Sequence, residues 1–307
     1  MSTGLPWLTE NEAELQHRLD TGQLAHALLI DGPSGLGKAR LARTLVNMLL
    51  PAHELLAAGT HPDYFQVAVD EEAHSAILID QIRALSEALI LSAGMGGARV
   101  GLILDAHRMN RNASNALLKT LEEPPDNAWL VLITDQPNRL PATVRSRCQR
   151  VSVHAPDAEM GLAWLREQMM SPSDHELQLA LSLSANAPLA ALALLEDNGL
   201  AFGQAVRDDL IALSEGGVVD DDLLSRWMSA PETVWRWLAL WLAQLATAST
   251  QTSDLHKAWP IQPKAGPIQN LWTQALEGTR LSDTSVRQDL LLQRWVLAWQ
   301  QACAKAR

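Results

Sequence analysis

The stretch Gly32-Pro-Ser-Gly-Leu-Gly-Lys-Ala39 determines the fold class expected of this chain. It matches the phosphate-binding loop pattern G-x-x-x-x-G-K-[S/T] at every fixed position except the last. The three glycines let the backbone turn its N–H groups toward phosphate oxygens, and the lysine adds a positive charge for the outer phosphates. We therefore expect a nucleotide-binding fold, in which the candidate nucleotide-binding residues are Gly32, Gly35, Gly37 and Lys38.

Two positions of this pattern lack the groups that would use a bound nucleotide. Ala39 stands where a hydroxyl should coordinate Mg²⁺. Further along, Arg99–His107 reads as a buried strand that ends in Asp105, the candidate Mg²⁺-binding carboxylate. Many hydrolysing relatives of this fold place a glutamate directly after that aspartate to orient the attacking water, and here Ala106 follows. The sequence predicts no ATPase activity of the chain's own, while binding of ATP or ADP stays open because Lys38 is present.

The composition is that of an ordinary globular protein. The chain has 307 residues, of which 47% are apolar and 19% charged, with a net charge of −11. This acidity argues against a surface that grips nucleic acid over its whole extent. The two cysteines, Cys148 and Cys303, argue against a disulfide framework and a cysteine-rich zinc site. We find no apolar run of membrane-spanning length and no leader pattern, and we expect a cytoplasmic protein.

Residues 1–153 alternate between strand and helix patterns. Such alternation predicts βαβ units and a mainly parallel sheet, in which ligands bind at the carboxyl ends of the strands. The expected strands are His26–Asp31, Tyr64–Val69, Val100–Asp105, Trp129–Thr134 and Gln149–Val153. The expected helices between them are Lys38–Leu50, Ile79–Leu91 and Asn112–Glu123.

After Pro156 the pattern is helical nearly to the end. Nine of the eleven tryptophans fall in this part. They predict a helical core filled by large rings, and the alternative is an exposed aromatic patch for partner subunits. Ser253–Pro267, with three prolines, predicts a loop. The candidate helices are 157–170, 174–185, 188–197, 200–214, 231–248, 267–277 and 284–305.

A second group of motifs is more specific than the phosphate loop. Asn112-Ala-Ser-Asn-Ala-Leu-Leu-Lys-Thr-Leu-Glu-Glu-Pro-Pro125 is followed by Trp129–Thr134 and by Thr143-Val-Arg-Ser-Arg-Cys148. Together with His61-Pro-Asp63, these segments closely resemble the clamp-loader branch of the AAA+ ATPases. The resemblance covers roughly residues 20–155 with motifs and extends through the helical remainder by size and order alone.

The resemblance implies a role for Arg147. In that branch, the arginine of the Ser-Arg-Cys triplet leaves its own subunit and reaches the γ-phosphate held by a neighbour. A guanidinium suits this task because it is always charged and bridges two phosphate oxygens. By this match Arg147 is a catalytic arginine finger acting in trans, and the alternative is an ordinary surface arginine. Thr134 lies where these ATPases place a polar residue facing the γ-phosphate, although a threonine that caps a strand is the plainer account.

Departures from the active members narrow the resemblance. Besides Ala39 and Ala106, Leu189 lies roughly where the helical lid of active members carries an arginine that touches nucleotide. A subunit that keeps the finger and loses its own site resembles the bacterial delta-prime family of DNA polymerase III. The delta subunit is a poorer match because it lacks the triplet, and gamma/tau should keep the catalytic groups. Many members also bind zinc through four cysteines, but Pro51–Thr60 contains none, so we expect no zinc or other metal.

The resemblance implies an α/β AAA+-type P-loop domain over residues 1–155, a small helical lid over 156–213, and an all-helical collar over 214–307. It also implies membership of the DNA polymerase III holoenzyme, a DNA-directed DNA polymerase. The implied partners are gamma/tau-like ATPase subunits and a delta-like subunit, with a sliding clamp and primed DNA reached through the complex. Two alternatives remain open, a working clamp-loader ATPase and a purely structural adaptor. Lys119 and Arg111 are read as solvated helix charges, with DNA contact as the alternative.

Overall fold

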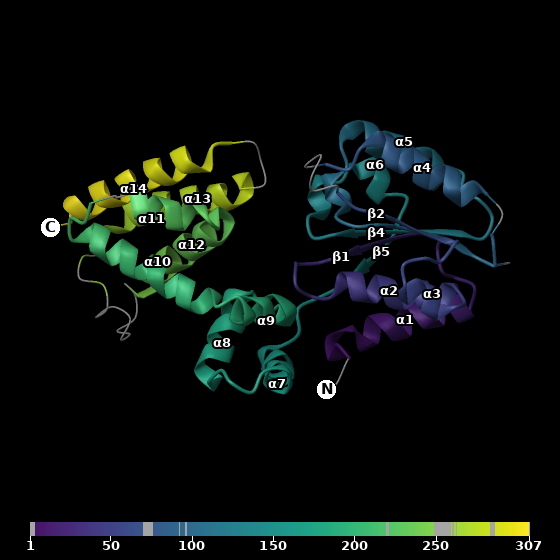
Figure 1. Ribbon diagram of the computed structural model, residues 1–307, viewed down its shortest axis with the longest axis horizontal. Coiled ribbons are helices and arrows are strands. Elements are labelled where there is room, and N and C mark those ends of the chain that lie inside the picture. Colours follow the sequence, from purple (N-terminus) through teal and green to yellow (C-terminus); the bar gives the residue numbers. More distant parts are fainter. Residues whose placement is uncertain are drawn as a thin grey trace. The chain divides into compact units, whose positions relative to one another are not determined.

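The structure is a computed structural model that describes residues 4–69, 76–91, 93–95, 97–218, 221–248, 259, 261, 263–282 and 286–306. The chain divides into two compact units, Met1–Ala193 and Leu194–Arg307 (Figure 1). The first contains the sheet and its surrounding helices, and the second is built of helices. The expected three-domain division stays a prediction.

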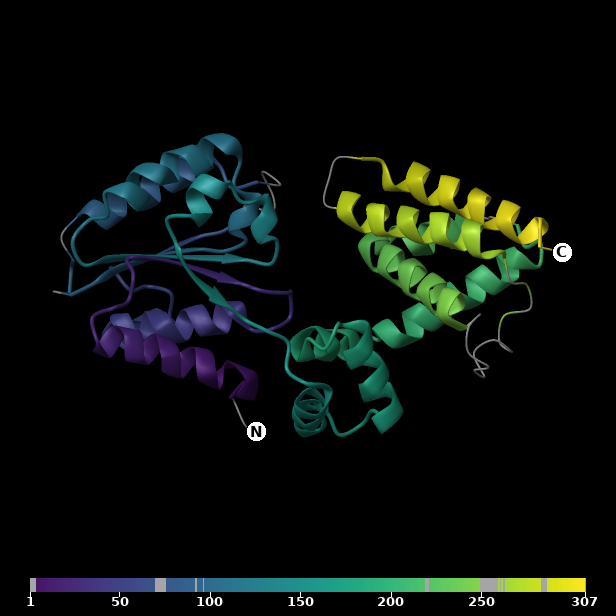
Figure 2. The same cartoon turned by 180° about the vertical axis from the view of Figure 1, so that it is seen from behind.

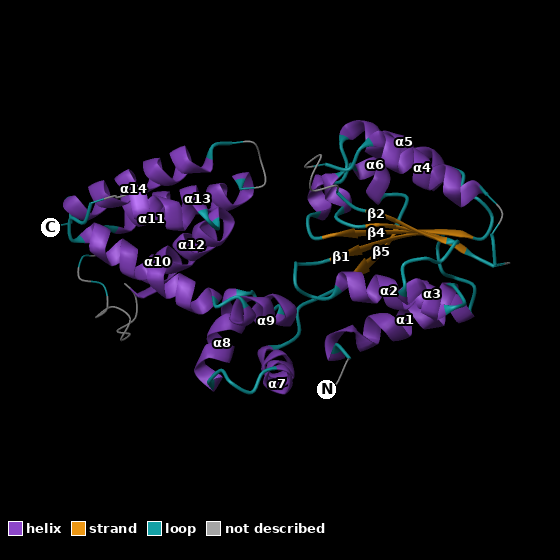
Figure 3. Ribbon diagram, viewed as in Figure 1, coloured by secondary structure: helices purple, strands orange, loops and turns teal. Residues whose placement is uncertain are grey.

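A five-stranded sheet forms the centre of the first unit, with strand order β2-β3-β4-β1-β5 and every pairing parallel. Every residue of β1 and of β3 is buried, as expected for strands covered by helices on both faces (Figure 3). The five predicted strands are therefore present. Their bounds are β1 (Ala27–Asp31), β2 (Tyr64–Val67), β3 (Arg99–Ile103), β4 (Ala128–Thr134) and β5 (Gln149–Ser152).

Helices cover both faces of this sheet. In Figures 1 and 2, α1 to α3 lie on one face and α4 to α6 on the other. On the second face, Leu, Ile, Val and Ala side chains from the sheet and from α4 and α5 form a continuous core that includes Ala106. The helices are η1 (Pro6–Leu8), α1 (Thr9–Asp20), α2 (Lys38–Leu49), α3 (His53–Ala57), α4 (Ile79–Ile90), η2 (Ala106–Arg108), α5 (Arg111–Glu122), η3 (Pro137–Arg139) and α6 (Ala142–Arg145).

Local signals in the sequence fix the ends of several helices. The Asn110 side chain accepts a hydrogen bond from the Ala113 amide at 2.8 Å and so caps the start of α5, which ends just before Pro124. A group of three helices then follows β5, and Asp157 and Ser173 cap the first two of them in the same way. These helices are α7 (Ala158–Gln168), α8 (Asp174–Leu183) and α9 (Pro188–Glu196).

The second unit is a helical assembly with a tryptophan-rich core. Of the nine tryptophans after Pro156, eight belong to this unit, and seven of these are at most 5% exposed, while Trp272 is 39% exposed. The prediction of a core filled by large rings is therefore confirmed for these seven, and Trp164 of α7 is buried in the first unit. Several buried indole N–H groups of this core have acceptors, since Trp241 and Trp299 donate to the carbonyls of Gly203 and Leu210 at 3.0 Å. The helices are α10 (Gly199–Ser214), α11 (Asp221–Met228), α12 (Pro231–Ala248), α13 (Ala265–Leu281) and α14 (Gln288–Ala304).

Two glycines admit the tryptophan rings into this core. A Cβ atom at Gly203 would lie 2.2 Å from the ring of Trp237, and one at Gly278 would lie 2.3 Å from the ring of Trp235. Both glycines are inside helices, where glycine ordinarily lowers stability. Here the missing side chain is what allows α10 and α13 to approach α12, so ring packing outweighs helix propensity.

The structure also contains elements that the sequence patterns do not predict. These are the N-terminal helix α1, the short helices α3 and α6, the helix α11, and the turns η1, η2 and η3. Helix α13 begins at Ala265, inside the predicted loop Ser253–Pro267, while residues 253–258, 260 and 262 of that loop lie outside the described residues. No strand follows Ser152 in the part of the chain that is described. Among the described helices, none alone has the length and apolar composition of a membrane span, and only the pair α8–α9, bent by 119°, meets those criteria jointly.

Replacing Gly203 by alanine should destabilise the second unit. The added methyl group must displace the Trp237 ring, and overpacking of this kind costs about 1–3 kcal/mol, more than the gain of ~0.5–1 kcal/mol from removing a helical glycine. Gly266→Ala is the matched control, because a Cβ there meets nothing within 4 Å. Calorimetric unfolding of the full chain should show a lower Tm for Gly203→Ala and an equal or higher Tm for Gly266→Ala. Equal Tm values for the two variants would contradict this packing argument.

Candidate functional site

The phosphate-binding loop joins β1 to α2 and has the expected backbone form. Gly32, Gly35 and Gly37 have φ angles of 141°, 76° and 83°, in the region that favours glycine. A Cβ atom at Gly32 would lie 2.2 Å from the carbonyl oxygen of Val153, which follows β5. The glycines thus allow both the turn itself and close packing against the neighbouring strand.

Parts of the same unit pack directly on this loop. The Leu189 amide, at the start of α9, donates a hydrogen bond to the Gly35 carbonyl at 3.1 Å. A Cβ atom at Gly35 would lie 2.4 Å from the Cβ of Ala190, and one at Gly37 would lie 2.4 Å from the Leu5 side chain. Apolar side chains of the N-terminal segment and of α9 therefore pack against Gly35 and Gly37 of the loop.

The N-terminal segment adds a polar contact to the loop. The Trp7 indole donates a hydrogen bond to the Leu36 carbonyl at 2.9 Å, and the Leu36 side chain is fully buried. The Trp7 ring also meets the Trp164 ring of α7 edge to face, with 5.3 Å between ring centroids. Trp7 therefore connects the phosphate loop to the α7–α9 group.

Lys38 is turned toward its own loop. Its amine donates a hydrogen bond to the Pro33 carbonyl at 2.7 Å, and the residue is only 8% exposed. Burial lowers the pKa of the Lys38 amine below its ordinary value, an effect that nearby Asp135, Asp105 and Asp31 partly oppose. The charge that would neutralise a nucleotide's outer phosphates is thus engaged by a backbone carbonyl of the loop.

The two residues that follow β3 at the expected acidic positions, Asp105 and Ala106, lie in different surroundings. Asp105 is exposed and has a φ of 47°, at the turn into η2. Ala106 is fully buried and belongs to the core between the sheet, α4 and α5. A glutamate side chain built at residue 106 in this conformation would start inside that core. The alanine therefore fits the packing as well as lacking a catalytic group.

Thr134 ends β4 and is fully buried. Its hydroxyl accepts a hydrogen bond from the Gln136 amide at 3.0 Å and lies 3.1 Å from Nδ1 of His107. The same His107 nitrogen lies 3.4 Å from a carboxylate oxygen of Asp135. Burial lowers the pKa of His107, and this effect is larger than the opposing one of Asp135. The contacts of Thr134 favour its role as a strand cap, and contact with nucleotide stays a prediction.

His107 and Asp135 were not singled out by the sequence patterns. His107 stands two residues after Asp105, and Asp135 directly follows Thr134. Their positions after two neighbouring strands, β3 and β4, are the signal that could have placed them together, because parallel strands end at the same edge of a sheet. Lys38, Asp105, Thr134, His107 and Asp135 thus form one polar group beside the phosphate loop.

Arg147 lies on the surface after α6, with its side chain 36% exposed. Its guanidinium forms an ion pair with Glu122, the last residue of α5, at 2.5 Å. It also donates a hydrogen bond to the Thr143 carbonyl at 2.9 Å. Neither contact involves the phosphate loop of this chain. The predicted site residues therefore form two separate groups: Arg147 contacts α5 and α6, and the others lie around the phosphate loop.

The His61-Pro-Asp63 motif has a structural role in this arrangement. Asp63 is 1% exposed, and its carboxylate accepts hydrogen bonds from the amides of Gly94 and Met95 at 2.7 and 3.0 Å. Its carboxylate also lies 3.5 Å from Nε of Arg99 at the start of β3. The motif therefore fixes the segment between α4 and β3.

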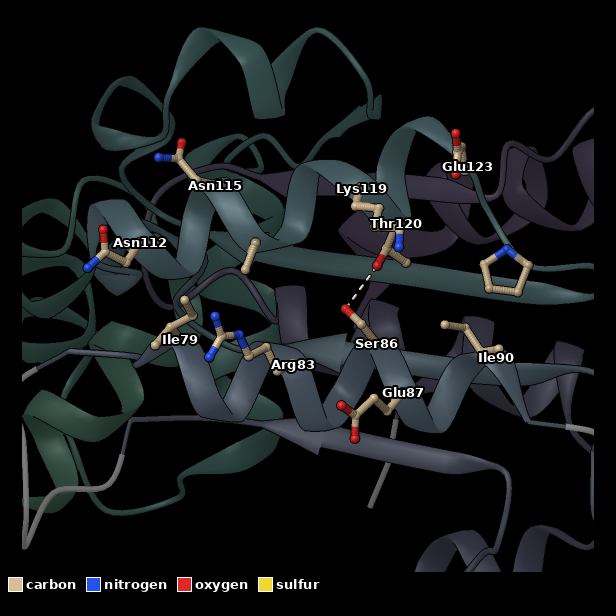
Figure 4. Close-up of a pocket in the computed structure, with 12 residues that line it drawn as sticks. Ile79, Arg83, Ser86, Glu87, Ile90, Asn112, Asn115, Lys119, Thr120 and Glu123 are labelled. Carbon is tan, nitrogen blue, oxygen red and sulfur yellow. Dashed lines mark hydrogen bonds between the residues drawn. The ribbon is translucent and has the colours of Figure 1, made fainter.

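A groove of about 590 Å³ lies between α4 and α5 (Figure 4). Thr120 donates a hydrogen bond to the Ser86 hydroxyl across it at 2.9 Å. Lys119 is at its wall, and Arg111 lies exposed at the start of α5. None of the predicted nucleotide-site residues lines this groove. Its lining residues are Ile79, Arg83, Ser86, Glu87, Ile90, Asn112, Asn115, Ala116, Lys119, Thr120, Glu123 and Pro125.

Known proteins resemble this chain over most of its length. A family model described as "DNA polymerase III, delta subunit" matches residues 8–157. The DNA polymerase III subunit delta' of Pseudomonas aeruginosa is 37% identical over 257 residues, which cover 77% of this chain and 75% of that protein. The corresponding Escherichia coli subunit is 38% identical over 204 residues, which cover 62% of this chain and 60% of that protein.

Similarity extends to a second kind of subunit at lower identity. The DNA polymerase III subunit tau of Escherichia coli is 29% identical over 221 residues, which cover 68% of this chain and 34% of that protein. Among solved structures, a gamma subunit-related protein from Thermotoga maritima aligns with a TM-score of 0.48 at 16% identity, covering 94% of this chain and 99% of that one.

The thiol of Cys148, next to Arg147, should resist alkylation at ordinary alkaline pH. Burial raises its pKa to about 11. Because the folded pKa is raised, the thiol's contribution to stability is complete below the unfolded pKa of about 8.5 and is lost as pH rises through about 11. In a Cys303→Ser variant, the rate of iodoacetamide labelling should still rise tenfold per pH unit up to about pH 10. The same variant in urea should level off near its ordinary pKa, and a similar plateau in the folded protein would contradict the prediction.

Proposed function

Because the chain belongs to the family of DNA polymerase III delta-prime subunits, and is therefore a clamp-loader subunit, we propose that it supplies Arg147 as an arginine finger to a neighbouring ATPase subunit. The similarity to tau supports a gamma/tau-like protein as that neighbour. In this proposal a delta-like subunit completes the assembly. The assembly places a sliding clamp on primed DNA.

The observation that carries the proposal is the placement of Arg147. Its guanidinium is on the surface, after a short helix anchored by the fully buried Val144. A planar, permanently charged guanidinium can bridge two oxygens of a phosphate that another subunit presents. Charge of this kind accelerates phosphoryl transfer because it stabilises the negative charge that spreads over the transferred group in the transition state.

The chain's own loop supports a role without hydrolysis. The Lys38 amine is hydrogen-bonded to the Pro33 carbonyl, and the Gly35 carbonyl accepts a hydrogen bond from the Leu189 amide. Ala39 offers no ligand for Mg²⁺. Apolar groups of the N-terminal segment and of α9 also pack against Gly35 and Gly37 of the loop. We therefore propose that the subunit requires no nucleotide and no zinc of its own. Binding of ATP or ADP at the loop is the competing possibility.

The proposal predicts the effect of Arg147→Ala on the assembled loader. Removing an arginine finger costs about 10³–10⁵ in rate at the site that it serves. We measure ATP turnover of a loader reconstituted with the variant, with clamp and primed DNA present. It should fall by at least the fraction of the total turnover that the served site contributes. Arg145→Ala is the control, because it removes the same charge two residues away. Turnover that is unchanged by Arg147→Ala would leave the structural adaptor as the better account.

A second prediction concerns the chain by itself. We expect no ATP hydrolysis by the purified chain above that of its Lys38→Ala variant, with Mg²⁺ and primed DNA present. The reason is that Lys38 is engaged within the loop and residue 39 cannot bind the metal. Nucleotide binding should be measured on the same two proteins by calorimetric titration. Turnover that depends on Lys38 would make this chain a working ATPase.

A further inference from the structure

Two groups of the same chain hold the guanidinium of Arg147. Glu122 accepts from Nη2 at 2.5 Å, and the Thr143 carbonyl accepts from Nη1 at 2.9 Å. An exposed arginine with no such contacts samples many rotamers, which carry a side-chain entropy of about 2 kcal/mol. Two simultaneous contacts restrict Arg147 to a small part of that range.

Rigid elements hold both of these groups. Glu122 ends α5, next to Leu121, which is 3% exposed and belongs to the core. The Leu121 carbonyl lies 3.2 Å from Nε2 of His26, the residue directly before β1, so the last turn of α5 is tied to the sheet. Thr143 is in α6, whose Val144 side chain is fully buried in the same core. The backbone of Glu122 and the Thr143 carbonyl are therefore held in place by the fold.

The contacts leave part of the guanidinium available. Among the described residues, neither contact uses the Nε–H group, and each terminal nitrogen keeps a second hydrogen. Arg147 can therefore receive the oxygens of a phosphate while it stays bonded to Glu122 and Thr143. The carboxylate does not have to leave before the finger acts.

We infer that Glu122 is a positioning residue for the Arg147 finger. It holds the guanidinium in one orientation on the surface before a phosphate arrives. The side-chain entropy of Arg147 is therefore already lost in the free subunit and is not lost again when the phosphate binds. The inference rests on the proposed function, since it assigns a partner to the finger. It deepens that function by naming the residue that sets the geometry of the trans contact.

The test is a double-mutant cycle in the reconstituted clamp loader, with clamp and primed DNA present. Glu122→Ala should lower kcat for ATP about two- to fivefold, the range expected when one exposed charge pair is lost, and leave the KM for ATP unchanged. Glu123→Ala is the matched control, because it removes the same charge from the adjacent residue, whose carboxylate makes no ion pair in the described part of the chain. In the Arg147→Ala background, Glu122→Ala should have no further effect on the residual turnover.

The outcomes separate this inference from the proposed function. If Arg147→Ala lowers turnover and Glu122→Ala does not, the finger stands and the positioning role is wrong. A higher turnover with Glu122→Ala would mean that the carboxylate masks the finger, which also overturns the inference. An equal loss in both backgrounds would show that Glu122 acts by another route. Turnover insensitive to Arg147→Ala would instead remove the proposed function itself. Thermal unfolding of each purified variant checks that the chain is folded.

Discussion

The backbone hydrogen bond from Leu189 to the Gly35 carbonyl makes the phosphate loop part of the protein's own packing. Here the bare backbone of Gly35 and Gly37 accepts Ala190 and Leu5, and Lys38 bonds to the loop itself. The glycines that suit phosphate binding are equally suited to close apolar contact, because both need a backbone without a Cβ atom. The loop thus connects β1 and α2 to the N-terminal segment and to the α7–α9 group.

Much of the α/β unit could be predicted because its signals are local. Each strand is a short apolar run beside a turn, and the caps of α5, α7 and α8 stand next to the helices that they begin. The phosphate loop was recognisable from its spacing, and Arg147 from its triplet. Helix α1 was missed because its pattern is weak, with only Leu15 buried in twelve residues, so its position depends on packing rather than on periodicity. Helix α11 is short and offers few periodic positions in the same way.

Interactions between distant residues were beyond sequence reasoning. The Trp7 indole donates a hydrogen bond to the Leu36 carbonyl, 29 residues away, and no sequence feature near either residue identifies the other as its partner. The ion pair of Arg147 with Glu122 is similar, since it depends on how α5 and α6 pack. Asp63 was noticed only as part of a motif, whereas its carboxylate holds the amides of Gly94 and Met95. In each case the missing information is which surfaces meet, and that is set by the tertiary core.

The tryptophan core of the second unit has a spectroscopic consequence. Of the eleven tryptophans, only Trp7, Trp129 and Trp164 belong to the first unit. The rings of Trp295 and Trp299 are stacked at 6.2 Å, and Trp235 and Trp259 each contact one of them at 6.4 and 6.0 Å between centroids. At such separations an excited indole passes its energy to its neighbours, so these rings emit as a group. Intrinsic fluorescence of this protein therefore reports mainly on the helical unit, and it is a poor gauge of whether the sheet is intact.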